Sequence, residues 1–129
     1  MRSMRSLDWV AIGLAILLGG WLLFDGSRAL VVGDYVTPRT GRFAGKLGPW
    51  SRLVTSVGLE PRSTWVKCIH AGIGLSWIAA GALFAVHAPM ARRGMLVCAV
   101  ASLWYLPFGT LISVIQIVLV QWPSARRSR

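Results

Sequence analysis

The residues best suited to proton transfer or metal binding are few and far apart in this chain of 129 residues. His70 and His87 are its only histidines. On one helix they would lie about 25 Å apart, so a single metal ion or haem cannot bind both. We therefore expect each to be an interfacial side chain that hydrogen-bonds to water or to a lipid headgroup. Pairing with a histidine of another chain is the alternative.

The acidic and nucleophilic residues form no recognisable catalytic set. The four acids are Asp8, Asp25, Asp34 and Glu60. None falls in the interior of an apolar run, since Asp8 and Asp25 lie at the two ends of the first run. The chain thus lacks the intramembrane carboxylate relay of a proton-coupled transporter. It has no Ser–His–acid set, HExxH motif or CxxC cluster. The sequence therefore predicts no catalytic residue, no cofactor and no metal site, in a protein that is not an enzyme.

The element that must position polar side chains is the uncharged stretch from Met95 to Trp122. As one helix it would measure about 40 Å, enough to cross a bilayer with some tilt. Its polar and small residues recur every three or four positions and so share one face: Cys98, Ser102, Tyr105, Gly109, Ser113 and Gln116. An unpaired amide in hydrocarbon is costly, so we expect this polar face to contact protein.

Two further apolar runs, 7–24 and 65–87, predict two more spanning helices. On the second, Gly72, Ser76 and Ala80 form a small-residue face, the predicted partner of the polar face. Trp77 and Trp104 fall in mid-span, where we expect them to fill the packing rather than to bind a pigment or quinone. The basic start of the chain also resembles a signal peptide, but its apolar run is long for one, which favours a retained helix.

Pro107 is expected to kink the last helix, because proline removes a backbone donor and clashes with the preceding turn. A division into two separate spans at this proline would give a protein of four spans. That alternative is disfavoured, because each half of the 95–122 stretch is too short to cross a bilayer.

The long polar segment 25–64 predicts local structure of its own. Pro49–Val57 reads as a short amphipathic helix lying in the headgroup plane. Ser63 or Thr64 is expected to cap the helix that follows. Asp25 is expected to cap a short helix that Gly33 ends. The fold class is therefore all-α: a single membrane domain, 1–129, with three transmembrane helices (about 7–24, 65–87 and 95–122) and a short interfacial helix.

Composition and charge agree with a multi-pass membrane protein. The chain is 55% hydrophobic with a mean hydropathy of +0.61. It is 14% charged, whereas a soluble domain carries about 25% charged residues. Its net charge of +10 resides outside the apolar runs, which indicates anionic lipid headgroups rather than nucleic acid as the partner. The predicted headgroup contacts are Arg39, Arg42, Lys46 and Arg52.

The distribution of basic residues predicts an orientation. Three spans would place the two termini on opposite sides of the membrane. The 25–64 loop with Lys67 and the carboxyl tail holds ten basic residues, and the amino tail with the 88–94 turn holds four. The positive-inside rule then favours a bacterial inner-membrane protein with its amino terminus outside and its carboxyl terminus in the cytoplasm.

Two stretches carry a resemblance to known sequences: DGSRALVVGDYVTPRTGRFAGKLGPW (25–50) and LWYLPFGTLISVIQIVLV (103–120). They resemble a group of small uncharacterised bacterial multi-pass membrane proteins. The resemblance covers about a third of the chain and implies a membrane location. It implies no catalytic role, because no activity is known for that group.

These observations predict an accessory, scaffold or assembly subunit that works through helix–helix contacts with another membrane protein or with a second copy. The alternative is a small homo-oligomeric transporter or channel in which Gln116 and Ser113 face a pore. A third possibility, an enzyme that acts on lipids through the basic loop, has the least support.

Overall fold

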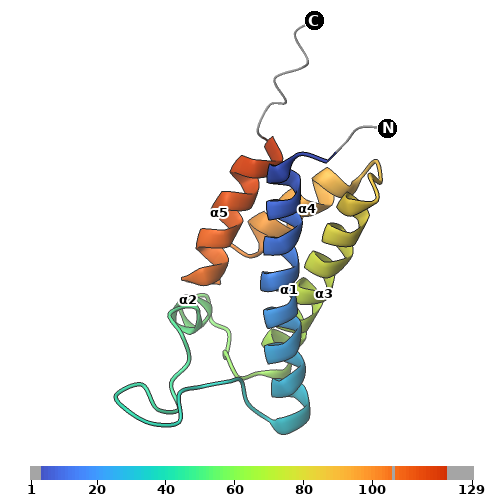
Figure 1. The fold of residues 1–129 in the computed structure, drawn as a ribbon. Helices are drawn as coiled ribbons and strands as arrows, with labels where there is room; N and C mark the ends of the chain where they lie inside the picture. Colours follow the sequence, from blue (N-terminus) through green and yellow to red (C-terminus); the bar gives the residue numbers. More distant parts are fainter. Residues whose placement is uncertain (1–3, 106, 122–129) are drawn as a thin grey trace, which may run out of the picture.

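A computed structural model describes residues 4–105 and 107–121, and this part of the chain is helical without strands. Its helices are α1 (Ser6–Val32), α2 (Trp50–Ser56), α3 (Thr64–Ala85), α4 (Ala91–Ala101) and α5 (Phe108–Gln121). The long helices α1 and α3 run antiparallel and side by side, and their packing is the most extensive in the molecule (Figure 1). The predicted all-α class is confirmed.

Two of the described helices are long and apolar enough to cross a membrane. They are α1 and α3, with a mean hydropathy of 2.0 and 1.6 over their most apolar stretches. The apolar helix α5 has 14 residues, fewer than the roughly 20 that a span requires. Length and composition thus support two candidate spans.

Helix α1 is longer than predicted, because Asp25 does not start a new helix. The helix continues through Asp25 to Val32 and buries Ala29 on the same side as Leu22. The Oδ1 atom of Asp25 instead accepts a hydrogen bond of 2.7 Å from the backbone N–H of Val36. The predicted stop at Gly33 is confirmed, since this residue adopts a left-handed φ of 105° that favours glycine.

Helices α1 and α3 approach each other at glycines. A Cβ atom built on Gly74 would overlap the backbone of Leu23 and lie 2.6 Å from the carbonyl oxygen of Gly19. A Cβ atom on Gly19 would lie 2.8 Å from the carbonyl oxygen of Gly74. We call this contact the glycine interface. It brings two backbones together because neither helix carries a side chain there.

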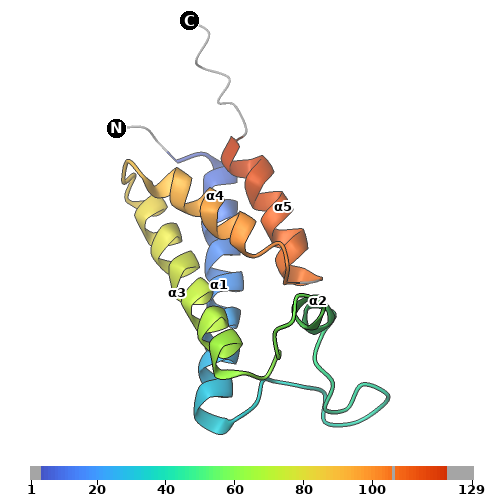
Figure 2. The same cartoon turned by 180° about the vertical axis from the view of Figure 1, so that it is seen from behind.

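The single bent helix predicted for Met95–Trp122 is wrong for the residues described, and Trp122 lies outside them. Helix α4 ends at Ala101, and after an irregular segment α5 starts at Phe108 and runs back toward the beginning of α4 (Figures 1 and 2). Between α4 and α5, tight turns replace the helix. In one of them the backbone N–H of Tyr105 donates a 3.1 Å hydrogen bond to the carbonyl oxygen of Ser102. Pro107 prevents the helix from continuing, and Gly109 fits the reversal because a Cβ there would lie 2.5 Å from the Tyr105 Cβ.

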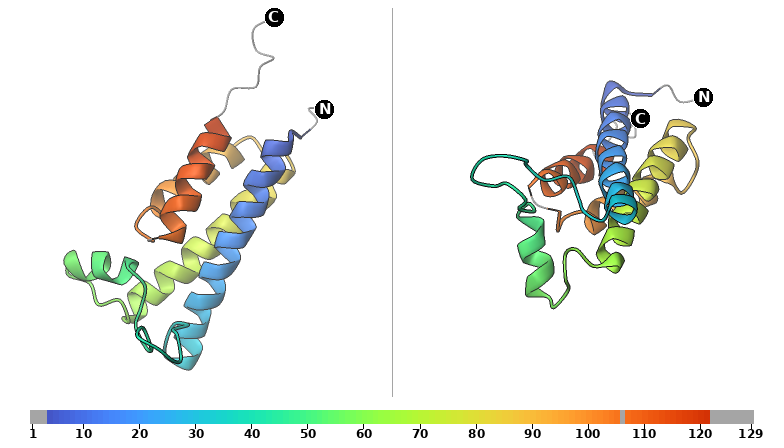
Figure 3. Two further views of the ribbon diagram at one scale, coloured as in Figure 1. Left: turned by 60° about the vertical axis from the view of Figure 1, so that its left-hand side comes forward. Right: turned by 90° about the horizontal axis from the view of Figure 1, so that it is seen from below.

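This reversal changes the expected topology. The start of α1, the turn between α3 and α4 and the end of α5 all lie at one end of the molecule (Figures 1 and 3). The loop 33–63, including α2, lies at the other end. Termini on opposite sides would need a third full span, which α4 and α5 do not provide. The basic carboxyl tail, 126–129, lies outside the described residues.

Two local predictions for the loop agree with the structure, the short helix near Pro49 and the cap at Ser63. The expected amphipathic helix at Pro49–Val57 is α2, Trp50–Ser56, which buries Trp50 and Val54 and leaves Leu53 exposed. Ser63 caps α3, with its Oγ accepting a 3.4 Å hydrogen bond from the backbone N–H of Val66.

Candidate functional site

The polar face predicted on 95–122 is covered by the chain's own helices. Ser102, Gly109, Ser113 and Gln116 are buried. The Trp77 indole of α3 donates a 2.8 Å hydrogen bond to the Ser102 Oγ. The Gln116 amide donates a 2.7 Å hydrogen bond to the carbonyl oxygen of Ala11 in α1. Trp77 is wholly buried, in keeping with its expected packing role.

The predicted small-residue face of α3 is not brought to this polar face. Ala80 is buried, but Gly72 and Ser76 are exposed, and a Cβ on Gly72 would meet open space. The buried face of α3 carries Gly74, Trp77 and Gly81 instead. The true contact residues lie one or two positions further along the helix than the predicted ones: Gly74 follows Gly72 by two positions, and Trp77 follows Ser76 by one.

The four predicted headgroup residues lie at the loop end of the molecule. Arg39, Arg42, Lys46 and Arg52 are all exposed. None forms an ion pair with a described acidic side chain. Arg42 lies over the Phe43 ring, with 5.8 Å between the guanidinium carbon and the ring centroid. Their contact with anionic lipid stays a prediction.

An aromatic cluster forms where α2, α3 and the α4–α5 break meet the loop. It consists of Tyr35, Trp50, His70, Trp104 and Tyr105. His70 lies at its centre, with ring centroids 4.6 Å from Trp50, 4.9 Å from Tyr35 and 5.3 Å from Trp104. The expectation of an interfacial His70 bonded to water or headgroups is wrong, because its side chain is fully buried among these rings.

The hydrogen bonding of His70 fixes its tautomer. Its Nδ1 lies 3.0 Å from the carbonyl oxygen of Val66, which can only accept, so Nδ1 carries the proton. Its Nε2 is then an acceptor, and it has no hydrogen-bond partner among the described residues. His87 differs, since it is exposed at the end of α3 with a left-handed φ of 59°.

A half-open cavity of about 260 Å³ lies beside the aromatic cluster. The loop supplies much of its wall, and α1, α2, the α4–α5 break and the start of α5 supply the rest. Five of its eleven lining residues are aromatic: Trp21, Asp25, Tyr35, Val36, Leu47, Gly48, Pro49, Trp50, Tyr105, Pro107 and Phe108. At its edge, Trp21 and Phe108 are 43% and 69% exposed. We call this space the aromatic cavity.

Two polar side chains of the aromatic cavity retain unused hydrogen-bonding capacity. Asp25 is 3% exposed, and the Val36 N–H is its only hydrogen-bond donor in the described chain. No ion pair joins Asp25 to a described basic side chain. The Tyr105 hydroxyl accepts a 2.9 Å hydrogen bond from the Trp21 indole, and its own proton has no described acceptor. The cavity therefore offers one carboxyl group and one hydroxyl group between apolar rings.

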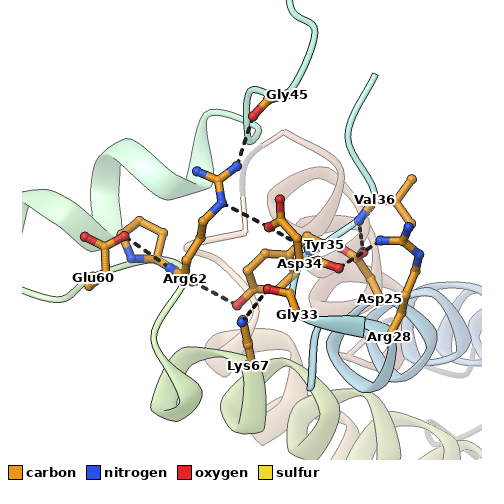
Figure 4. A network of polar contacts seen from close by, with 11 residues as sticks. Asp25, Arg28, Gly33, Asp34, Tyr35, Val36, Gly45, Glu60, Arg62 and Lys67 are labelled. Atoms are coloured by element: carbon orange, nitrogen blue, oxygen red, sulfur yellow. Dashed lines mark hydrogen bonds and ion pairs between the residues drawn. The ribbon is translucent and has the colours of Figure 1, made fainter. Parts of the chain in front are cut away.

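A network of polar contacts ties the loop to the helices beside the cavity (Figure 4). Arg62 contacts the Asp34 Oδ1 at 3.0 Å and the carbonyl oxygen of Gly45 at 2.9 Å. Lys67 donates a 2.8 Å hydrogen bond to the carbonyl oxygen of Gly33. The Tyr35 hydroxyl donates a 2.9 Å hydrogen bond to the carbonyl oxygen of Pro61. These contacts hold the part of the loop that walls the cavity.

Two loop residues of this network have shifted pKa values. Burial works to raise the pKa of the Asp34 carboxyl, but hydrogen bonds from Arg62 and from the Tyr35 backbone outweigh it, and the pKa falls below the usual 3.8. Burial, reinforced by the charges of Asp25 and Asp34, raises the pKa of the Tyr35 hydroxyl, which stays protonated at neutral pH. The loop is thus held by an ionised acid and a neutral phenol.

Sequence reasoning did not predict that Asp25, Tyr35, Trp50 and Tyr105 meet at one site, the aromatic cavity. One signal was present: Trp21 and Asp25 are four positions apart and share a face of α1. Tyr35, Trp50 and Tyr105 come from other segments of the chain, and no spacing pattern linked them to this face. Within the described ranges, no group of three His, Cys, Asp or Glu side chains is placed to hold a metal ion.

No protein-family model matches the chain, and neither the curated proteins nor the solved structures contain a significant match. The resemblance of 25–50 and 103–120 to small bacterial membrane proteins therefore stays a prediction.

Proposed function

We propose that this is an integral membrane protein that binds a small amphiphilic molecule in the aromatic cavity. In this proposal α1 and α3 cross the bilayer, and α4 and α5 form a re-entrant pair that enters and leaves on one side. Exposed apolar side chains on these helices support it, among them Leu17, Leu75, Val97 and Leu111. A soluble protein rarely exposes so much apolar surface, whereas lipid would cover it.

The observation that carries the proposal is the composition of the aromatic cavity. Ligand sites are typically apolar clefts with a few well-placed polar groups, which is how this lining is built. Trp21 and Phe108 expose apolar rings at its edge, and Asp25 lies about 10 Å along α1 from the loop end of that helix. A molecule with an apolar tail and a polar end matches this arrangement, with its tail against the exposed rings and its polar end at Asp25.

Binding is favoured over catalysis because the reactive groups do not converge. His70 is the one buried histidine, yet it is not among the residues that line the cavity with Asp25. An acid–base mechanism would need both groups within hydrogen-bond reach of one substrate. We therefore keep the expectation that the protein is not an enzyme.

The proposal is tested by filling the cavity. Leu47 is partly buried and lines it, so Leu47→Trp should occupy the space and abolish binding of an amphiphile such as decanol. Leu59→Trp is the matched control, because Leu59 is 47% exposed on the same loop and lies outside the cavity lining. Calorimetric titration in maltoside micelles measures both. Equal binding by the two variants would refute the proposal.

The accessory role predicted from the sequence keeps one supporting feature. Gly72 and Ser76 face outward from α3, where another helix has room to approach. The channel alternative has less support, because neither Ser113 nor Gln116 lines the aromatic cavity and Gln116 is bonded to α1. Gly72→Leu should release a co-purifying partner if the accessory role holds, and unchanged co-purification would count against it.

A further inference from the structure

We infer that the molecule bound in the aromatic cavity carries an organic ammonium group, which Asp25 and the surrounding rings recognise. This inference rests on the proposed function, since it names the chemistry of the ligand for the same cavity. Its support is the juxtaposition of one buried carboxyl group with several aromatic rings.

Asp25 is a buried acid that forms no ion pair within the described chain. Its carboxyl is hydrogen-bonded by Val36 alone, although burying a carboxylate costs several kcal/mol unless a positive charge accompanies it. The nearest basic residue along α1 is Arg28, one turn later. Its guanidinium donates a 2.8 Å hydrogen bond to the carbonyl oxygen of Asp34. Arg28 attracts the Asp25 carboxyl only at longer range, and a ligand cation would supply a positive charge in direct contact with it.

The walls of the cavity suit a cation that is weakly hydrated. Trp21, Tyr35, Trp50, Tyr105 and Phe108 all contribute rings to the lining. Trp50 and Tyr105 are stacked, with 5.8 Å between their ring centroids and 29° between their planes. The faces of aromatic rings attract ammonium groups, and alkylated ammonium gives up little hydration when it enters such a cage. A compact inorganic cation would instead require several oxygen ligands.

The charge of the cavity wall favours an ammonium group over an anionic headgroup as the ligand. Among the described residues no arginine or lysine side chain lines it, so a phosphate or carboxylate would meet Asp25 with no basic side chain in the cavity wall to compensate. The exposed basic residues Arg39, Arg42, Lys46 and Arg52 belong to the outer surface of the loop and α2. Charge complementarity therefore favours an ammonium group.

The test compares three ligands in neutral maltoside micelles: decyltrimethylammonium, decanol and tetramethylammonium. Calorimetric titration should show decyltrimethylammonium binding about tenfold or more tightly than decanol to the native protein. Asp25→Asn retains an acceptor for the Val36 N–H while removing the charge. It should abolish this preference, because it weakens decyltrimethylammonium far more than decanol, whose hydroxyl can still hydrogen-bond to the asparagine amide.

Phe108→Leu is a second variant that does not endanger folding, because Phe108 is 69% exposed. It should weaken the ammonium ligand several-fold and decanol little, by removing one ring from the cage. Binding of tetramethylammonium as tight as that of the decyl compound would assign the cation to the aqueous phase. Weak binding of tetramethylammonium would assign it to a membrane amphiphile. Either result supports ammonium recognition.

Three results would overturn the inference in distinguishable ways. Equal affinities of native protein and Asp25→Asn for decyltrimethylammonium would refute the ammonium assignment, while continued sensitivity to Leu47→Trp would preserve the cavity as a binding site. Equal affinities of the native protein for decanol and decyltrimethylammonium would also refute the ammonium assignment, and would still leave the cavity as a binding site. Failure of all three ligands to bind the native protein would refute both the proposed function and the inference.

Discussion

The two faces of α1 make contacts of opposite kinds. One face carries Gly19 and Gly26, which bring the backbone of α3 to within contact distance. The other carries Trp21 and Asp25, which face the aromatic cavity. Asp25 and Gly26 are adjacent in the chain, yet one lines an open space and the other has no room for a methyl group. Small residues thus fix the position of α3. On the other side, α1 contacts the loop and the α4–α5 break through longer side chains: Asp25 accepts a hydrogen bond from Val36, and Trp21 donates one to Tyr105.

The glycine interface should be the part of this comparison most sensitive to substitution. Gly74→Ala places a methyl group against the backbone of Leu23 and Gly19, where nothing flexible can move away. We expect it to destabilise the protein by about 3 kcal/mol. Gly72→Ala is the matched control, since its Cβ meets open space and alanine favours a helix. Thermal unfolding in detergent measures both, and equal melting temperatures would show that the backbones are not in contact.

A buried hydrogen bond between α3 and the end of α4 should show an intermediate effect. Ser102→Ala would leave the indole N–H of the fully buried Trp77 without its acceptor, at a cost of about 1–2 kcal/mol. Ser76→Ala is the matched control, because that hydroxyl is exposed and bonds only within its own helix, to Gly72. Similar stabilities of the two variants would mean that the α4–α5 break is not anchored to α3.

The polar loop that walls the cavity should show the smallest effect, visible through pH. The pKa of the Asp34 carboxyl lies below 3.8 in the folded protein. Its ion pair with Arg62 therefore stabilises the folded state fully at pH values above the pKa of Asp34 in the unfolded chain. This stabilisation is lost as the pH falls through the pKa of Asp34 in the folded protein. Both side chains are more than 40% exposed, which limits the contribution to below about 1 kcal/mol. Asp34→Asn should therefore lower stability near neutral pH, and the difference from native should shrink as the pH falls below the unfolded pKa of about 3.9. A difference that is constant with pH would contradict this role.

Local sequence signals predicted those parts of the fold that depend on near neighbours. Gly33 ends α1, Ser63 caps α3 and Trp50 opens a short amphipathic helix, each for a reason contained within one turn of chain. The continuation of α1 through Asp25 was not predictable in this way. Its carboxyl finds a partner in Val36, which reaches it only once the loop has folded back.

The break at 102–107 and the candidate site depend on contacts between distant segments. Pro107 signalled a kink, but reversal of the chain also needs Gly109 to accept the Tyr105 side chain. The rings of Trp50, His70 and Tyr105 come from three separate segments and meet only in the folded protein. The spacing of residues along the chain marked helix faces without indicating that these rings come together beside one cavity.

The arrangement of α5 beside the start of α1 is the claim on which the aromatic cavity depends, and one distance tests it directly. Spin labels at Val10 and Val118, both exposed, would report that distance by pulsed electron resonance, after Cys68 and Cys98 are replaced by serine and alanine. Neighbouring helices lie about 10 Å apart, so the structure predicts a separation below about 20 Å. A single rod through 95–122 would place the labels on opposite sides of the bilayer, roughly 30 Å or more apart, and that result would contradict the fold and the site built on it.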